Sequence, residues 1–231
     1  MTPNVTTNQP DAPANFSART LGEIACELPG ATAVFRRHHL DFCCGGNVAL
    51  AVAAERRGID VAALSGELLS LDPGAAPALP DDTDALIERI VARFHEAHRA
   101  ELPELIRLAT KVERVHAEHP RAPQGLAAHL EDMQQELLDH MEKEETVLFP
   151  MMRESPGPFI VNPIARMRGE HDDHGRALRR VFELTDEMQL PDGACNTWRA
   201  LYVGLRKFTD DLTEHIHAEN NALFRRFEPQ S

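Results

Sequence analysis

The sequence predicts an all-α protein, a four-helix bundle of up-down-up-down topology preceded by a small helical N-terminal domain. Apolar residues recur at helical spacing along four long segments of the C-terminal part of the chain. Short connections join these segments, as in antiparallel helix bundles. The 231 residues contain no alternating β-rich runs and no Asn-Gly hairpin signal, so strands are not expected.

The first third of the chain differs in composition from the rest. Residues 1–16 are polar and rich in Pro, Asn and Thr, and we predict a disordered tail there. Residues 17–71 contain four short helical patterns punctuated by glycines, which predict a small helical domain. Residues 72–81 are rich in Pro and Ala and are predicted to form a linker. The bundle is therefore expected over residues 82–228.

The first two bundle helices each contain a proline. The first is predicted over about 82–117, with Asp82 or Thr83 as its N-cap and a kink at Pro103. The second is predicted over about 123–153 and should be disturbed near its end by Pro150.

The last two bundle helices carry clearer boundary signals. Asn162 is predicted to cap the third helix, with Pro163 at its first position, and this helix should end near Leu190. A Pro-Asp-Gly turn follows, and the fourth helix is predicted over about 194–227.

An internal repeat runs through the bundle. The segments DHMEKEETVLF (139–149) and EHIHAENNALF (214–224) both read acid-His-x-x-x-Glu-x-x-x-Leu-Phe. The segments FHEAHRAEL (94–102) and EHDDHGRAL (170–178) both contain His-acid-x-His-x-x-x-Leu. His and Glu four residues apart share one helix face. The bundle is thus expected to be two related helical hairpins, each with a His on its first helix and a His-x-x-x-Glu on its second.

The repeat predicts a site for two metal ions. Imidazole and carboxylate together suit iron, manganese or zinc, and two carboxylates can bridge two cations. The alternative is an exposed helix face, where each His–Glu pair contributes a few tenths of a kcal/mol. One pair alone favours that alternative, but two pairs with two further histidines in register favour metal. The predicted ligands are His95, His140, Glu144, His171, His215 and Glu219.

Other polar residues near the repeat carry weaker signals. His98 and His174 follow predicted ligands by three residues, so they could lie beside the metal ligands or face solvent, and solvent is favoured for both. His217 is also expected to face solvent. Metal-bound histidines usually donate their second N–H to a carboxylate or carbonyl. Three acids could take this role or could be ordinary surface charges, and the sequence leaves both open: Glu136, Glu170 and Asp211.

With these residues in view, the chain resembles the repair-of-iron-centres family, hemerythrin-like di-iron proteins also called iron–sulfur cluster repair proteins. The resemblance rests on LGEIACELPGATAVFRRHHLDFCCGG in the N-terminal part, and in the bundle on LPELIRLATKVERVHAEHP, HMEKEETVLFPMM, EHDDHG, ACNTWRALY and HIHAENNALF. It implies a hemerythrin-like bundle with an oxo-bridged pair of iron ions on the same six ligands, both glutamates bridging.

The resemblance also implies a function, namely protection or repair of iron–sulfur clusters damaged by nitric oxide or oxidative stress. Iron donation and removal of bound nitric oxide are the implied routes. The partners would be damaged iron–sulfur proteins, with nitric oxide or oxygen as small ligands. Two alternatives stay open, an enzyme that reduces nitric oxide at the di-iron centre and a hemerythrin-like sensor of oxygen or nitric oxide. The oligomeric state stays open too.

The four cysteines fall into two classes. Cys43 and Cys44 precede two glycines and are predicted to be accessory reactive thiols on an exposed turn. Their pKa values are expected to be lowered by basic neighbours: Arg36, Arg37, His38 and His39. The alternative is a buried apolar pair, since free cysteines are often inside. Cys26 and Cys195 lie in helical patterns and are expected in the core.

Composition limits the partners and the compartment. The formal net charge of −13 argues against nucleic acid and anionic membranes. The sequence has no apolar run long enough to cross a bilayer, and its first residues lack signal-peptide features. A cytoplasmic location is therefore expected, where disulfides are rare.

Overall fold

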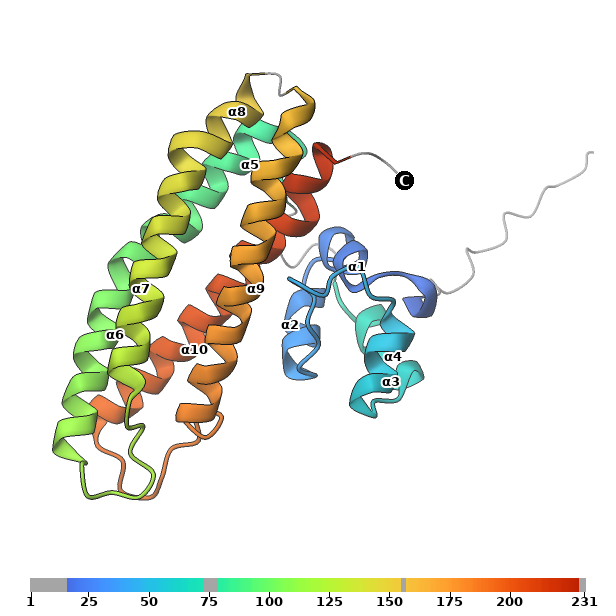
Figure 1. Cartoon of the computed structure of the whole chain (residues 1–231). Coiled ribbons are helices and arrows are strands. Elements are labelled where there is room, and N and C mark those ends of the chain that lie inside the picture. Colours follow the sequence, from blue (N-terminus) through green and yellow to red (C-terminus); the bar gives the residue numbers. More distant parts are fainter. Residues whose placement is uncertain (1–15, 73–78, 155–156, 229–231) are drawn as a thin grey trace, which may run out of the picture. The chain divides into compact units, whose positions relative to one another are not determined.

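The computed structural model describes residues 16–72, 79–154 and 157–228 (Figure 1). The chain divides into two compact units, Met1–Pro77 and Ala78–Ser231. Most of the predicted tail and linker lies outside the described residues. Phe16, the last residue of the predicted tail, is an exception, because it begins a short 3-10 helix and is buried in the core of the first unit.

The described residues of the first unit form four short α-helices: α1 (Leu21–Glu27), α2 (Ala31–Arg37), α3 (Leu50–Arg57) and α4 (Val61–Leu69). A capping box starts α1, since the Thr20 hydroxyl accepts a hydrogen bond from the Glu23 N–H and the Glu23 carboxylate accepts one from the Thr20 N–H. Apolar residues from all four helices form one core. Cys26 is only half-buried, so its predicted place in this core is wrong.

The first bundle helix consists of α5 (Thr83–Ile90), a π-helical turn (Val91–His95) and α6 (Glu96–Val115). Asp82 is its N-cap as predicted, because its carboxylate accepts a hydrogen bond from the Ala85 N–H at 2.8 Å. The helix does not end at Pro103, which lies inside α6.

The second bundle helix is built in the same way. It consists of α7 (Leu126–Lys143), a π-helical turn (Glu144–Leu148) and α8 (Phe149–Arg153). Pro150 lies in the first turn of α8, directly after the π-helical turn. The predicted disturbance near Pro150 is thus a local change of helix type.

The third helix, α9 (Val161–Leu184), differs from the prediction at both ends. A 3-10 turn (Pro158–Ile160) leads into it, so Asn162 and Pro163 lie within its first turn and Asn162 is not the cap. The helix ends before Leu190 because Asp186, Glu187 and Met188 adopt left-handed backbone angles, with φ from 50° to 56°.

The fourth helix consists of α10 (Asn196–His217), a π-helical turn (Ala218–Leu223) and a 3-10 turn (Phe224–Arg226). Cys195 is its N-cap and is half-buried, so it is not the predicted core residue. At its other end, Leu223 and Phe224 are buried in an apolar cluster with residues of α5, α8 and α9.

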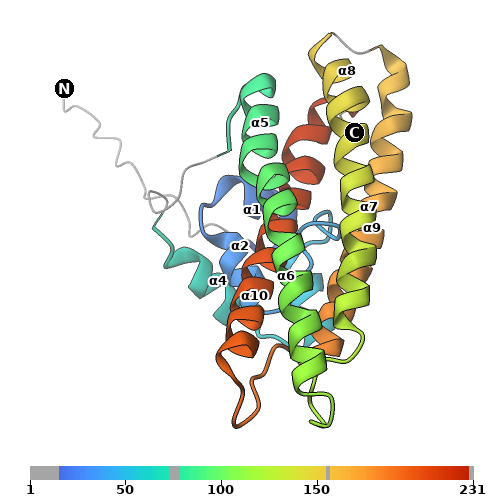
Figure 2. The same cartoon turned by 90° about the vertical axis from the view of Figure 1, so that its left-hand side faces the viewer.

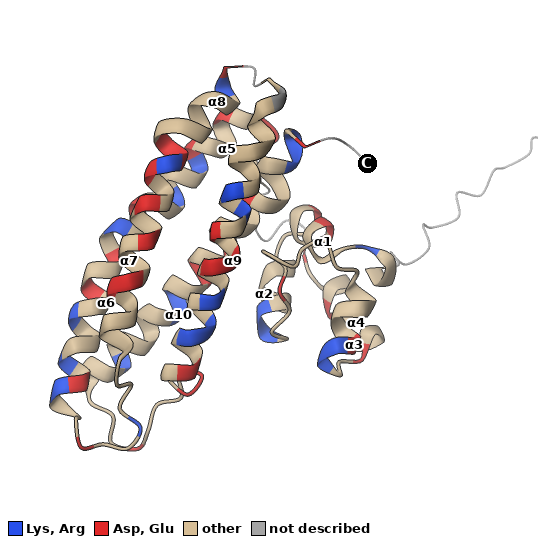
Figure 3. Cartoon of the chain, viewed as in Figure 1, with Lys and Arg blue, Asp and Glu red and all other residues tan. Residues whose placement is uncertain are grey.

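The four long helices form the predicted up-down-up-down bundle (Figures 1 and 2). The part of the chain that the structure describes contains no β-strand, only an isolated bridge between Thr20 and Ala49. None of the helices in that part combines the length and the apolar character needed to cross a bilayer. Acidic and basic residues are interspersed along the helices (Figure 3). The predicted fold class is confirmed.

Candidate metal centre

Three of the four bundle helices switch to π-helical hydrogen bonding where the predicted ligands lie. In the second helix, for example, the Phe149 N–H donates to the carbonyl of Glu144, five residues earlier. Such turns are rare and often mark functional sites. Each of the three turns contains one predicted ligand: His95, Glu144 or Glu219.

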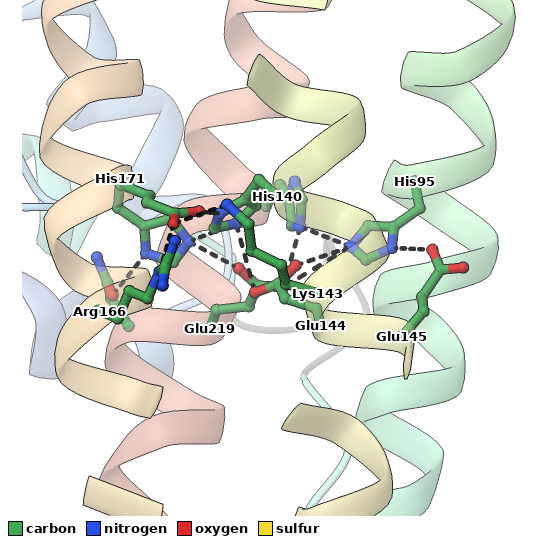
Figure 4. A network of polar contacts seen from close by, with 11 residues as sticks. His95, His140, Lys143, Glu144, Glu145, Arg166, His171 and Glu219 are labelled. Atoms are coloured by element: carbon green, nitrogen blue, oxygen red, sulfur yellow. Dashed lines mark hydrogen bonds and ion pairs between the residues drawn. The ribbon is translucent and has the colours of Figure 1, made fainter. Parts of the chain in front are cut away.

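The structure brings all six predicted ligands together in the bundle core (Figure 4). Each side chain is at most 1 % exposed. The four histidines approach one another through Nε2. The Nε2 atoms of His95 and His215 lie 3.0 Å apart, and those of His140 and His171 lie 3.2 Å apart. The six predicted side chains therefore converge through atoms that are able to bind a metal.

The six side chains form two groups that share both glutamates. Glu219 directs Oε1 toward His215 Nε2 and Oε2 toward His171 Nε2, each at 3.0 Å. Glu144 directs Oε2 toward His95 at 3.5 Å and Oε1 toward His140 at 3.4 Å. In each group the candidate ligand atoms lie within 4.8 Å of one another. Each carboxylate is thus placed to bridge two cations.

The pairing of histidines crosses the two hairpins. His95 of the first helix is grouped with His215 of the fourth, and His140 of the second with His171 of the third. Each candidate site therefore depends on both halves of the internal repeat.

The chemistry of this donor set fits metal cations. A buried carboxylate without compensation is costly, and both oxygens of Glu144 lack a hydrogen-bond partner among the described residues. Two imidazole nitrogens and two shared carboxylates per group suit iron, manganese or zinc. A pair of divalent cations would compensate the buried negative charge.

The carboxylates and imidazoles of the cluster shift one another's pKa values. Burial lowers the pKa of His140, but Glu144, Glu219 and Glu170 together more than offset this and raise it to about 9. Burial raises the pKa of Glu219, and His215, His171 and His95 reverse this and hold it well below its usual value. Because a metal ion binds imidazole in its neutral form, metal binding at His140 would release a proton.

Two residues that the sequence analysis missed contact the Nδ1 atoms of candidate ligand histidines. His95 Nδ1 lies 2.6 Å from the carboxylate of Glu145, which Arg99 also contacts at 2.7 Å. His171 Nδ1 lies 2.8 Å from the side-chain oxygen of Asn220. These contacts keep the N–H on Nδ1 and leave Nε2 free for a metal. A signal was present, because each of these residues directly follows a shared glutamate in the repeat.

Of the three acids left open by the sequence, only Glu170 contacts a candidate ligand. It lies 3.0 Å from His140 Nδ1 and also contacts Lys143 and Arg166. Asp211 instead contacts Arg93 and Lys207. Glu136 is exposed.

His215 is held differently. In the internal repeat, Phe94 occupies the position that corresponds to Glu170. The Phe94 ring stacks on the His215 ring, with 5.4 Å between the ring centres. His215 Nδ1 has no hydrogen-bond partner among the described residues.

Three histidines predicted to face solvent are buried. His98, His174 and His217 are 0 %, 3 % and 2 % exposed. The first two follow candidate ligands by three residues, and this spacing keeps a side chain on the same helix face, one turn further along the core. His217 is buried because the end of α10 is enclosed, and its Nδ1 lies 3.1 Å from the Asn221 amide.

The thiol pair in the first unit lies in different surroundings from those predicted. Cys43 is buried and Cys44 half-buried. The Asp41 carboxylate accepts hydrogen bonds from the Cys44 and Gly45 N–H groups, each at 3.0 Å. The hydrogen bond to Cys44, burial and the Asp41 charge raise the pKa of Cys43, contrary to the predicted lowering. Two of the expected basic neighbours contact Glu67 instead: Arg37 and His38.

Comparisons with known proteins agree with this architecture. The family model described as hemerythrin HHE cation binding domain matches residues 86–227. A domain of unknown function (DUF542) matches residues 17–72.

Relatives match over nearly the whole chain. Three of them are called "Iron-sulfur cluster repair protein YtfE" and come from Yersinia pseudotuberculosis serotype IB, Yersinia pestis (strain Pestoides F) and Dickeya chrysanthemi (strain Ech1591). Each is 46% identical to this chain, over 92% of this chain and 97% of its own length. The chain therefore belongs to the hemerythrin HHE cation-binding family and, along most of its length, to the family of iron–sulfur cluster repair proteins.

Proposed function

We propose that this protein is a di-iron protein that protects or repairs iron–sulfur clusters damaged by nitric oxide or oxidative stress. The observation that carries the proposal is the pair of buried two-histidine groups that share Glu144 and Glu219. The relatives' name supports the repair role. Damaged iron–sulfur proteins would be the partners, and nitric oxide or oxygen the small ligands.

We propose two iron ions with an oxo bridge as the cofactor. His95 and His215 would hold one ion, His140 and His171 the other, and the two glutamates both. Bound iron would supply redox chemistry and open positions for a small molecule.

The surrounding residues orient the ligands and shield them from water. Glu145, Glu170 and Asn220 contact the Nδ1 atoms of three histidines, which fixes the ring orientation. Aromatic rings also stack on the imidazoles. The ring centres of Phe149 and His95 lie 5.9 Å apart, and those of Phe224 and His171 lie 5.8 Å apart. This apolar cover limits access to small molecules, so a cluster inside another protein would have to exchange material elsewhere.

The repair role is tested with a nitrosylated iron–sulfur dehydratase. The iron-loaded protein is expected to restore dehydratase activity, and Glu219→Ala to restore none, because that change removes a shared carboxylate. Glu142→Ala, which alters an exposed acid on α7, is the matched control and should repair normally. Equal repair by Glu219→Ala and the unaltered protein would contradict the proposal.

Reduction of nitric oxide is a second candidate function. One observation favours it: the two candidate metal-binding groups share Glu144 and Glu219. Two iron ions bound there would therefore be neighbours. Two nitric oxide molecules, two electrons and two protons give one nitrous oxide and one water. Continuous nitrous oxide formation with an external reductant would favour this enzyme, and reversible stoichiometric binding without turnover would favour a sensor.

We propose an accessory role for Cys43 and Cys44, as thiols that pass iron, electrons or nitrosyl groups between a client protein and the bundle. Cys44 is the better candidate because it is half-buried, whereas Cys43 is buried. We also propose a division into an N-terminal domain (17–71), a linker (72–81) and a bundle (82–228), and a cytoplasmic location.

The thiols are expected to differ in reactivity at neutral pH. Iodoacetamide should label Cys44 faster than Cys43, because Cys43 is buried and its raised pKa leaves little thiolate. Labelling of Cys43 should rise as the pH is increased toward that pKa. Peptide mass spectrometry separates the two sites, and urea-unfolded protein serves as the control. Faster labelling of Cys43 at pH 7 in the folded protein would show that the turn is arranged differently.

A further inference from the structure

Two histidines outside the six candidate ligands lie beside them. His98 and His174 occupy equivalent positions of the internal repeat. The His98 ring centre lies 5.3 Å from that of His215, and the His174 ring centre lies 5.0 Å from that of His140. Each two-histidine group therefore has one additional imidazole next to it.

The direction of the helices places these imidazoles opposite the shared carboxylates. Glu144 and Glu219 lie one turn beyond their ligand histidines on α7 and α10, which run upward in Figure 1. His98 and His174 lie one turn beyond theirs on α6 and α9, which run downward. The layer of four ligand histidines thus has carboxylates on one side and the additional imidazoles on the other.

Each additional histidine has at least one buried ring nitrogen without a hydrogen-bond partner among the described residues. Both ring nitrogens of His98 and Nε2 of His174 lack a hydrogen-bond partner among the described residues, although the two side chains are 0 % and 3 % exposed. His98 has two aromatic neighbours. Its ring centre lies 5.5 Å from that of Phe208 and 6.4 Å from that of Phe94. An unpartnered buried N–H is unfavourable, so packing alone would favour an apolar side chain here.

The chemistry of imidazole suits these positions for binding a small ligand. A neutral imidazole has one N–H donor and one acceptor nitrogen. Each additional histidine can therefore offer a hydrogen bond to a ligand bound beside it.

We propose that His98 and His174 form a hydrogen-bonding subsite for a small anion or polar diatomic molecule bound at the metal centre, one imidazole for each two-histidine group. The inference rests on the proposed function, since the ligand needs the metal ions. Two histidines and two shared carboxylates leave positions on each ion for a small ligand. The additional imidazoles lie on the side of the histidine layer that the carboxylates do not occupy.

Azide is the probe, because its binding to the iron-loaded protein is followed by visible absorption. A neutral hydrogen bond typically contributes about a factor of ten in affinity. We expect the dissociation constant for azide to rise about tenfold in His98→Leu and in His174→Leu, and further in the double variant. Iron content should stay at two per chain, and the melting temperature should not fall, because leucine removes an unsatisfied group.

Two further variants separate this role from a structural one. His129 lies on α7, and its Nε2 has a partner, the carbonyl of Ala177, at 2.9 Å. His129→Leu should lower the melting temperature and leave azide affinity unchanged, the reverse of His98→Leu. His98→Gln, which retains an N–H donor, should recover part of the azide affinity.

The outcomes distinguish the subsite from the metal centre. Unchanged azide affinity in the double leucine variant at full iron loading would overturn the subsite. Loss of iron from that variant would also overturn it, since the histidines would then be needed to hold metal. Absence of iron or of an azide band in the unaltered protein would instead count against the proposed di-iron function itself.

Discussion

Glu219→Ala is expected to lose both iron ions, whereas His171→Ala should lose only one. The carboxylate of Glu219 contacts His215 in one group and His171 in the other, each at 3.0 Å, so its removal damages both groups. His171 belongs to only one group. Iron analysis of the purified variants should give two ions per chain for the unaltered protein, close to none for Glu219→Ala and about one for His171→Ala.

The exposed acid Glu142 provides the control for this comparison. Glu142→Ala removes the same functional group two residues before Glu144 and should keep both ions. Retention of two ions by Glu219→Ala would show that this carboxylate does not bridge, and equal loss from Glu142→Ala would point to a general effect of negative charge.

Removal of iron is expected to lower the melting temperature of the bundle substantially. The site buries two carboxylates among four imidazoles, and binding to the folded state stabilises it by about 4 kcal/mol per site at a thousandfold excess over Kd. For a domain of this size about 1 kcal/mol corresponds to roughly 2–4 °C, so each ion should contribute about 8–16 °C. Thermal unfolding with and without a strong iron chelator measures the effect.

Glu219→Ala also controls for direct effects of the chelator. That variant should hold no iron, so the chelator should leave its melting temperature unchanged. An equal melting temperature of the iron-loaded and iron-free unaltered protein would mean that the buried cluster is stable by itself and that metal is not what compensates its charge.

The internal repeat was sufficient to predict the candidate site. Its four histidines and two glutamates are the residues that the structure brings together, because i, i+4 spacing on two helices and matching register on two others leave little freedom in an antiparallel bundle. The pairing of His95 with His215 across the hairpins could not be predicted, since sequence spacing does not show which helices are neighbours.

Burial was predicted less well than position. His98, His174 and His217 were expected in solvent, but all three side chains are buried. The π-helical turns could not be predicted either, because the sequence pattern was read with the 3.6-residue period of an α-helix. The turn after Lys143 accompanies the contact between Glu145 and His95, which helical spacing alone would not suggest.

The N-terminal unit shows a similar limit. Basic residues near Cys43 in sequence suggested a lowered thiol pKa, but Arg37 and His38 contact Glu67, on another helix, 2.9 Å away in each case. Asp41 and Cys44 contact the Cys43 thiol. Proximity along the chain was therefore a poor guide to the electrostatic environment of this side chain.

The most direct test of the account is X-ray absorption spectroscopy at the iron edge on the iron-loaded protein. If Glu144 and Glu219 bridge two ions, the spectrum should show a second iron atom at roughly 3–4 Å from each iron. Iron analysis of the same sample should give two ions per chain. The shared-carboxylate centre would be contradicted if the spectrum showed only nitrogen and oxygen neighbours, with no second iron at that distance. A single iron ion per chain would also contradict it.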